Sequence, residues 1–240
     1  MMLATAIPEG PAALLPRSWR TNDQIRSQLA PTVARIARES GVGTLVQESV
    51  LFVYPDSGAH WVEESAPLQP ARQAASCLSA EFAAREFQAD GGSGRRAVIL
   101  RFGLFAAPDS GLSRQIWQLA TRGRALVLGD LEGYTTQIHA SDAALAVVHT
   151  LGGDVPGGTY NACADPVTRA GWLESLSEVV GRAVGPPPSA VRMALPLIAP
   201  TAEALARSIR LDSSALVATG WEPQFPDVEA IWRAVGAGVG

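Results

Sequence analysis

Lysine is absent from this chain of 240 residues, whose 19 basic residues are all arginine. Any mechanism that depends on a lysine ammonium or a Schiff base is therefore excluded. Cysteine is almost as scarce, because Cys77 and Cys163 stand far apart and outside any metal-ligand spacing. We expect neither a disulfide framework nor a metal site, and both thiols are interpreted as small buried residues.

Charge is also sparse, since charged residues make up 18% of the chain and give a formal net charge of -4. No basic stripe with interleaved aromatic residues is present, so nucleic acid is not an expected partner. No apolar run approaches the roughly 20 residues that span a bilayer, and the first residues lack a signal peptide's positive segment. With 47% hydrophobic residues the chain is predicted to be a compact cytoplasmic protein that does not enter a membrane.

Helical and strand-like patterns alternate along the first half of the chain. Apolar residues recur at helical spacing over residues 22–39, and an Ala-rich stretch over residues 69–88 favours a second helix. Short apolar runs typical of buried strands follow each helix, at residues 44–53 and at residues 97–100. A buried strand after each helix predicts βαβ units and a parallel sheet.

The second half is more helical. Residues 125–128 are predicted to form a strand, Asp142 is predicted to cap a helix, and residues 172–180 carry a clean helical stripe. We expect a single globular unit in which residues 1–130 form a partial Rossmann-like core. Residues 131–240 then form mainly a C-terminal substrate lobe.

Six segments carry a further pattern: Met2–Pro8, Gly43–Tyr54, Leu100–Gly103 with Pro108, Gln137–Ala144, Gly158–Asn161 and Gly220–Pro223. In this order they resemble the extended short-chain dehydrogenases, the NAD-dependent epimerase/dehydratase family, from its fourth core strand to its end. The resemblance covers nearly the whole chain. It implies an α/β fold with a truncated Rossmann-like, doubly wound parallel sheet and a small C-terminal substrate-binding lobe.

The catalytic positions of that family are altered here. The family binds its dinucleotide at a Gly-x-x-Gly-x-x-Gly turn after its first strand, and this sequence has no match. Aligned on the Ala-Glu pair at residues 80–81, the family's catalytic tyrosine corresponds to Gln73 and its lysine to Cys77. Its polarising serine corresponds to Val50, or to Ser49 after a one-residue slip. The resemblance therefore implies no bound cofactor and no hydride transfer, since glutamine has no titratable proton and a thiol is not an ammonium.

The substrate side of the family pattern remains. Glu48, Tyr134 and His139 are the candidate acid–base groups. The alternative for Glu48 is an ion pair with an arginine, and the alternative for His139 is a structural role before a helix. Candidate substrate-binding residues at the expected crevice are Ser49, Val50, Tyr54, Gln73, Cys77, Arg101 and Phe102.

The leading interpretation is a cofactor-independent protein that promotes cyclisation, isomerisation or dehydration of a small organic substrate in bacterial secondary metabolism. One alternative is a non-catalytic small-molecule-binding or scaffold protein. Another is a fragment of a longer NAD(P)-dependent enzyme. A homodimer is also expected, and the resemblance favours the two helices at residues 22–39 and 69–88 as its interface. The alternative interface is the exposed edge of the first strand, at residues 2–7.

Overall fold

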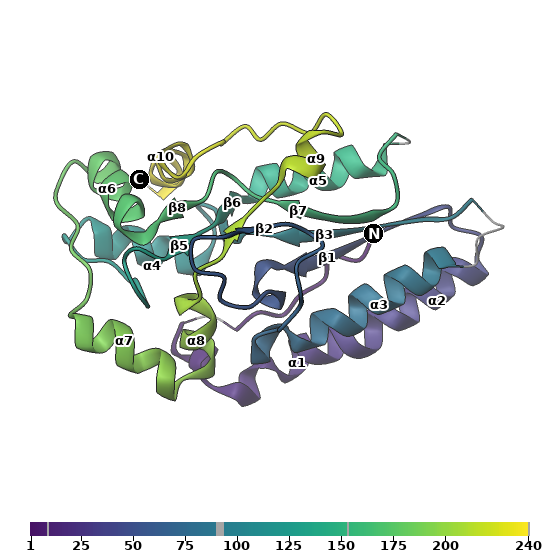
Figure 1. Ribbon diagram of the computed structural model, residues 1–240, viewed down its shortest axis with the longest axis horizontal. Coiled ribbons are helices and arrows are strands. Elements are labelled where there is room, and N and C mark those ends of the chain that lie inside the picture. The colour runs from purple at the N-terminus through teal and green to yellow at the C-terminus, as the bar shows by residue number, and fades with distance from the viewer. Residues whose placement is uncertain (9, 90–93, 153, 240) are drawn as a thin grey trace.

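A three-stranded parallel sheet forms the centre of the computed structural model (Figure 1). The structure describes residues 1–8, 10–89, 94–152 and 154–239. The sheet has the order β1–β3–β7, with β1 at Thr44–Val50, β3 at Arg96–Phe102 and β7 at Gly158–Ala162. Helices cover both faces of the sheet, which is why the residues of β1 and β3 are almost all buried. The parallel α/β sheet predicted from sequence is confirmed.

The first residues of the chain extend this sheet beyond β1 by one bridge. The Met2 N–H donates to the Val46 carbonyl at 2.7 Å, and the Glu48 N–H donates to the Met2 carbonyl at 3.1 Å. The chain then turns away, because the Ala6 N–H bonds to the Asn22 side chain at 3.0 Å. The strand expected from the segment Met2–Pro8 is thus reduced to a single bridge.

One face of the sheet is covered by two long helices that lie side by side (Figure 1). The first runs continuously through α1 (Arg20–Gln24), a π-helical turn η3 (Ile25–Leu29) and α2 (Ala30–Glu39). Pro31 explains the π turn, because its ring lacks an N–H and excludes the carbonyl four residues earlier. The second helix, α3 (Ala75–Ala89), packs on β1 and β3. Both helices were predicted from sequence.

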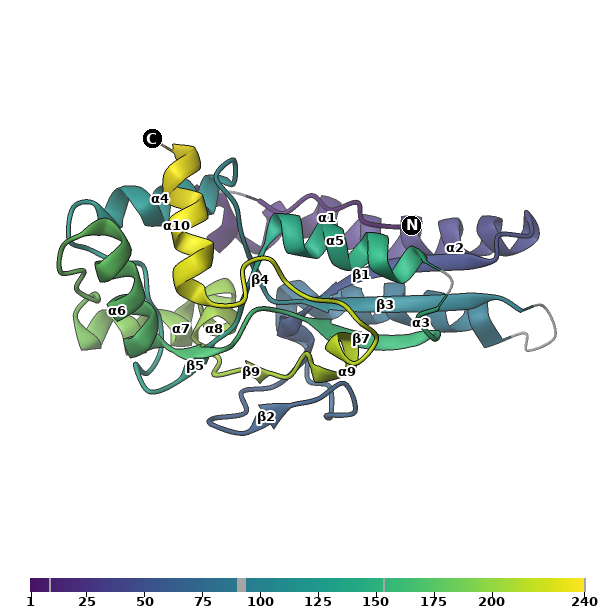
Figure 2. The same ribbon diagram turned by 90° about the horizontal axis from the view of Figure 1, so that it is seen from above.

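The other face is covered by α5 (Ala140–Leu151) and α9 (Ser214–Val217) (Figure 1). A lobe of further helices gathers at one end of the molecule, the left in Figure 2. Its helices are α4 (Gly111–Ala120), α6 (Arg169–Val180), α7 (Ser189–Ile198), α8 (Pro200–Ala206) and α10 (Val228–Val239). Trp172 and Trp232 meet edge to face in its core, with ring centroids 5.9 Å apart.

Short strand pairs and 3-10 turns complete the fold. The pairs are β2 (Trp61–Val62) with β9 (Arg210–Leu211), β4 (Leu104–Ala106) with β6 (Gln137–His139), and β5 (Tyr134–Thr135) with β8 (Val167–Thr168). The turns are η1 (Gly10–Leu14), η2 (Pro16–Trp19), η4 (Leu51–Val53) and η5 (Arg72–Ala74). Among the helices of the described residues, none combines the length and the apolar character that a bilayer crossing requires.

Two local predictions need correction. Residues 125–128 form no strand, because Ala125 makes one backbone bond to Gly185 and Val127 is buried in the core of the helical lobe. The sheet itself takes β7 from beyond residue 130, so both predicted regions contribute to it. The division of the chain at that residue stays a prediction.

The second correction concerns the start of α5. His139 is the N-cap, with its Nδ1 accepting from the Ser141 N–H at 3.3 Å. Asp142 lies in the first turn instead, and its carboxylate accepts the backbone N–H groups of Gln224 and Phe225 at 2.8 and 3.0 Å. Asp142 thereby fastens the C-terminal segment to the helix that it was expected to cap.

Candidate functional site

A buried carboxylate on α3 organises the carboxyl end of the sheet. Arg101 on β3 donates to both Glu81 oxygens, at 2.9 Å from Nε and 2.7 Å from Nη2. The Ser49 hydroxyl and the Arg85 guanidinium each add a bond of 2.7 Å. Burial alone raises the pKa of Glu81, but the hydrogen bonds and the charge of Arg101 outweigh it and hold the pKa below its ordinary value. Glu81 is therefore ionised and fully paired.

The same network continues across the sheet to β7. Arg101 Nη1 donates to the Tyr54 hydroxyl at 2.7 Å, and that hydroxyl donates to Asn161 Oδ1 at 2.8 Å. The Asn161 amide then donates to the Val62 and Asp212 carbonyls at 3.1 and 3.0 Å. Burial raises the pKa of Tyr54, so its proton is retained. Three substrate-binding candidates, Ser49, Tyr54 and Arg101, are thus brought together, but their polar atoms are satisfied inside the protein.

Glu48 faces the helix at residues 20–39. Its two carboxylate oxygens accept from Arg26 Nε at 2.8 Å and from Arg26 Nη2 at 3.0 Å. Arg26 projects inward from the π turn, and both side chains are at least nine-tenths buried. The ion pair that was the alternative interpretation of Glu48 is the arrangement observed.

Cys77 is wholly buried next to this ion pair and to Ser49. Burial raises the pKa of its thiol to about 12, so the group is neutral and unreactive near neutral pH. Val50 and Phe102 are the last residues of β1 and β3 and lie opposite one another in register. Their side chains add apolar surface at the same end of the sheet.

The other two acid–base candidates also have internal contacts. The Arg210 guanidinium lies 4.6 Å from the Tyr134 ring centroid and 4.0 Å from that of Trp61, stacked on both. His139 caps α5 and lies 4.2 Å from the Phe225 ring, with its Nε2 buried and unpaired. Burial lowers the pKa of His139, which keeps the ring neutral.

An open cavity of about 380 Å³ lies between η2, α1 and η5. Its walls include Arg17, Trp19, Arg20, Asp23, Arg72 and Gln73. The segment that carries Arg72 and Gln73 is tied to the carboxyl end of β1, because the Gln69 and Ala71 N–H groups donate to carbonyls of η4 at 3.0 and 2.9 Å. Of the substrate-binding candidates, Gln73 lines this cavity.

Sequence reasoning missed the arginines of this cavity and the centre of the buried network. Arg17 and Arg20 flank Trp19 in a segment without apolar periodicity, which gave no sign that they face the start of α3. Glu81 did leave a signal, because Gln73 in η5 and Cys77 and Glu81 in α3 recur at four-residue spacing and are all buried. Such a spacing predicts a carboxylate aimed at the sheet.

The described residues do not fit a nicotinamide dinucleotide. In the described ranges, none of the three sheet strands enters a helix through a glycine-rich turn: β1 leads into η4, β3 into β4, and β7 into a loop. Gln73 and Cys77 are both buried, and neither supplies an ammonium or a phenol.

Sequence comparisons relate the chain to epimerase family proteins. No family model matches the chain. Epimerase family proteins of Mycobacterium bovis and Mycobacterium tuberculosis are each 27% identical over 159 residues, which is 65% of this chain and 52% of theirs. The chain thus spans about half the length of the curated relatives it matches.

Solved structures are similar over most of the chain. The human epimerase family protein SDR39U1 with NADPH has a TM-score of 0.79 at 20% identity, covering 93% of this chain and 78% of its own. Thermus thermophilus UDP-glucose 4-epimerase with NAD has a TM-score of 0.73 at 21% identity, covering 99% of this chain and 76% of that protein. Streptomyces venezuelae dTDP-glucose 4,6-dehydratase with NAD has a TM-score of 0.72 at 19% identity, covering 98% of this chain and 70% of that protein. The fold predicted from the six sequence segments is confirmed.

Proposed function

From a fold shared with the NAD-dependent epimerase/dehydratase proteins, we propose that this protein binds a small organic molecule at the carboxyl edge of its sheet without nicotinamide chemistry. The observation that carries the proposal is the pair Gln73 and Cys77, which stand where the resemblance requires a tyrosine and a lysine. The cavity beside Gln73 supports binding, because open α/β sheets bind ligands outside the carboxyl ends of their strands.

Cofactor-independent cyclisation, isomerisation or dehydration is the second candidate, and Asp23 favours it. Asp23 supplies a carboxylate on the cavity wall, where its Oδ1 accepts from the Ser76 hydroxyl at 2.8 Å. Glu48, Tyr134 and His139 are not among the described lining residues of this cavity. In a catalytic version of the proposal, Asp23 therefore takes the proton-transfer role.

Calorimetric titration with NADH and NADPH tests the loss of nicotinamide chemistry. We expect no binding tighter than about 100 µM, which corresponds to roughly -5.5 kcal/mol. Tighter binding contradicts the proposal and favours the alternative that the chain is part of a longer NAD(P)-dependent enzyme.

A thermal-shift screen of neutral and charged small organic molecules tests the binding site itself. A ligand that binds the folded state raises the melting temperature. At a ligand concentration of 100 times the Kd, it adds about 2.7 kcal/mol to the free energy of unfolding. Hits are expected to lose their effect in Gln73→Trp, which fills the cavity, and to keep it in Val148→Trp, an exposed position on α5. A screen whose hits are indifferent to Gln73→Trp argues against this site.

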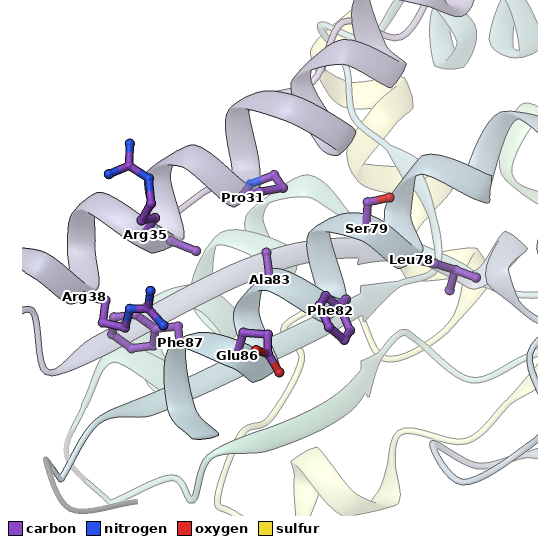
Figure 3. A pocket seen from close by; sticks show the side chains of 10 residues that line it. Pro31, Arg35, Arg38, Leu78, Ser79, Phe82, Ala83, Glu86 and Phe87 are labelled. Carbon is purple, nitrogen blue, oxygen red and sulfur yellow. The ribbon is translucent and has the colours of Figure 1, made fainter. Parts of the chain in front are cut away.

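A second copy of the chain is the proposed partner. A groove of about 540 Å³ runs between α2 and α3, and Figure 3 shows Phe82 and Leu78 on α3 opposite Pro31 and Arg35 on α2. Phe82 is 62% exposed. The groove also carries charges of both signs, with Arg35 on α2 and Glu86 on α3, so two copies related by a two-fold axis can bring opposite charges together.

Light scattering tests this homodimer. We expect a dimer that buries at least about 1,200 Å² in total and that Phe82→Glu converts to a monomer near 25.1 kDa. Val148→Glu, at a 65% exposed position on α5, is the matched control and is expected to remain a dimer. A wild-type monomer at micromolar concentration refutes the assembly.

A further inference from the structure

Three arginines and one aspartate are among the residues that line the cavity beside Gln73. The cations are Arg17, Arg20 and Arg72, and the anion is Asp23. Two positive charges therefore lack a balancing acid on the cavity wall. This local surplus contrasts with the formal net charge of -4 for the whole chain.

The three arginines are also free of partners. Within the residues that the structure describes, none of their guanidinium groups forms a hydrogen bond or an ion pair, and all three residues are exposed. The buried arginines Arg26 and Arg101, by contrast, are held by the carboxylates of Glu48 and Glu81. The lining arginines are thus available to a ligand without breaking an internal contact.

Two further residues of the cavity wall indicate what kind of uncharged group a ligand would carry. The Trp19 indole is held by a hydrogen bond from its Nε1 to the Ala13 carbonyl at 2.9 Å, and Trp19 is the aromatic residue among those that line the cavity. Gln73 is 7% exposed, and its buried Oε1 has no hydrogen-bond partner. An acceptor without a partner beside an aromatic surface suits an organic molecule with a hydrogen-bond donor.

We propose that this cavity is a binding subsite for a small organic phosphate monoester, an inference that rests on the proposed function of the crevice. A phosphate monoester carries about -1.5 to -2 charge at neutral pH, which matches the two unbalanced positive charges. The planar guanidinium forks of Arg17, Arg20 and Arg72 are suited to bidentate contacts with its oxygens. Trp19 and Gln73 contact the organic part.

Calorimetric titration with phenyl phosphate at low ionic strength tests the assignment. We expect a Kd below about 1 mM, and binding at least about tenfold weaker in the double variant Arg17→Gln/Arg72→Gln. Arg122→Gln makes the same charge change at an exposed arginine outside the cavity wall and is expected to bind as the wild type does. Circular dichroism checks that the variants are folded.

Phenol and benzoate separate charge from the aromatic ring. Phenol is expected not to bind, and benzoate, with a single charge, is expected to bind at least about fivefold more weakly than phenyl phosphate. The assignment is overturned if benzoate binds as tightly, or if the double variant binds phenyl phosphate as well as the wild type. A neutral hit from the compound screen that depends on Gln73 overturns the phosphate assignment while leaving the proposed function in place.

Discussion

The buried network around Glu81 and the open cavity around Gln73 use the same kinds of residue in opposite ways. In the network, Arg101 is 2% exposed and Glu81 is fully buried, and their charged atoms pair with each other. In the cavity, Arg17 and Arg72 are exposed and have no partner in the described chain. Because a buried charge must be paired while an exposed one is solvated, breaking the network is expected to destabilise the fold, whereas the arginines of the cavity stay available to the proposed ligand.

The largest effect is expected in the network. Glu81→Gln removes the charge that Arg101 and Arg85 share, which leaves the buried Arg101 guanidinium without its counterion. We expect the free energy of unfolding to fall by about 3–5 kcal/mol in urea denaturation. Glu39→Gln, at an exposed pair with Arg35, is the control and should cost less than about 0.5 kcal/mol. Equal losses at both sites remove the distinction between the two regions.

The ion pair between Arg26 and Glu48 is expected to behave as part of the closed region. Glu48→Gln should lower the free energy of unfolding by about 3 kcal/mol, because it leaves a buried guanidinium unpaired. Binding of phenyl phosphate by the folded fraction should be unchanged, since Glu48 is not among the described residues of the cavity wall. A variant that keeps its stability but loses binding or turnover restores Glu48 as a functional group.

Acid separates the two regions further, because the buried network depends on the Glu81 carboxylate, whose pKa is lowered. The pKa of Glu81 is lowered in the folded state, so its contribution to stability is complete above the ordinary value of 4.5 and is lost as pH falls through the folded value. Urea midpoints measured downward from pH 7 should fall more steeply for the wild type than for Glu81→Gln/Arg101→Met. Arg17→Gln/Arg72→Gln should follow the wild-type curve.

Much of this fold was visible in the sequence, because its signals are local. The stripes over residues 22–39 and 69–88 and the strands β1 and β3 follow from apolar periodicity. The hydrogen-bond partners of the buried polar side chains were not visible, since Arg26 and Glu48 are 22 residues apart and Tyr54 and Asn161 are 107 apart. Only the packing of α3 against the sheet decides which charges are enclosed.

The same limit explains the mixed outcome for the candidate site. The structure brings Ser49, Tyr54 and Arg101 together at one end of the sheet, but the sequence does not show that Glu81 and Asn161 occupy their polar atoms there. The strand expected at residues 125–128 failed for a related reason. An apolar run indicates burial, and here the run is buried in a helical lobe.

The smallest effect is expected at Gln73, where the two regions meet. Its buried Oε1 has no partner, and an unsatisfied buried acceptor costs about 1–3 kcal/mol. Gln73→Met keeps the size of the side chain and removes that acceptor, so the free energy of unfolding should stay the same or rise by up to about 1 kcal/mol. The variant should also bind a hydroxylated phosphate monoester, such as glycerol phosphate, more weakly in calorimetry.

Gln47→Met is the matched control for that substitution. Gln47 is 2% exposed like a core residue, but its Nε2 donates to the Glu48 carbonyl at 2.8 Å, so the change breaks a bond that exists. We expect Gln47→Met to lower the free energy of unfolding by about 1–2 kcal/mol. If Gln73→Met lowers stability as much as Gln47→Met does, the Gln73 amide is satisfied in the free protein. Gln73 then belongs to the closed network, and the cavity holds a ligand through its arginines alone.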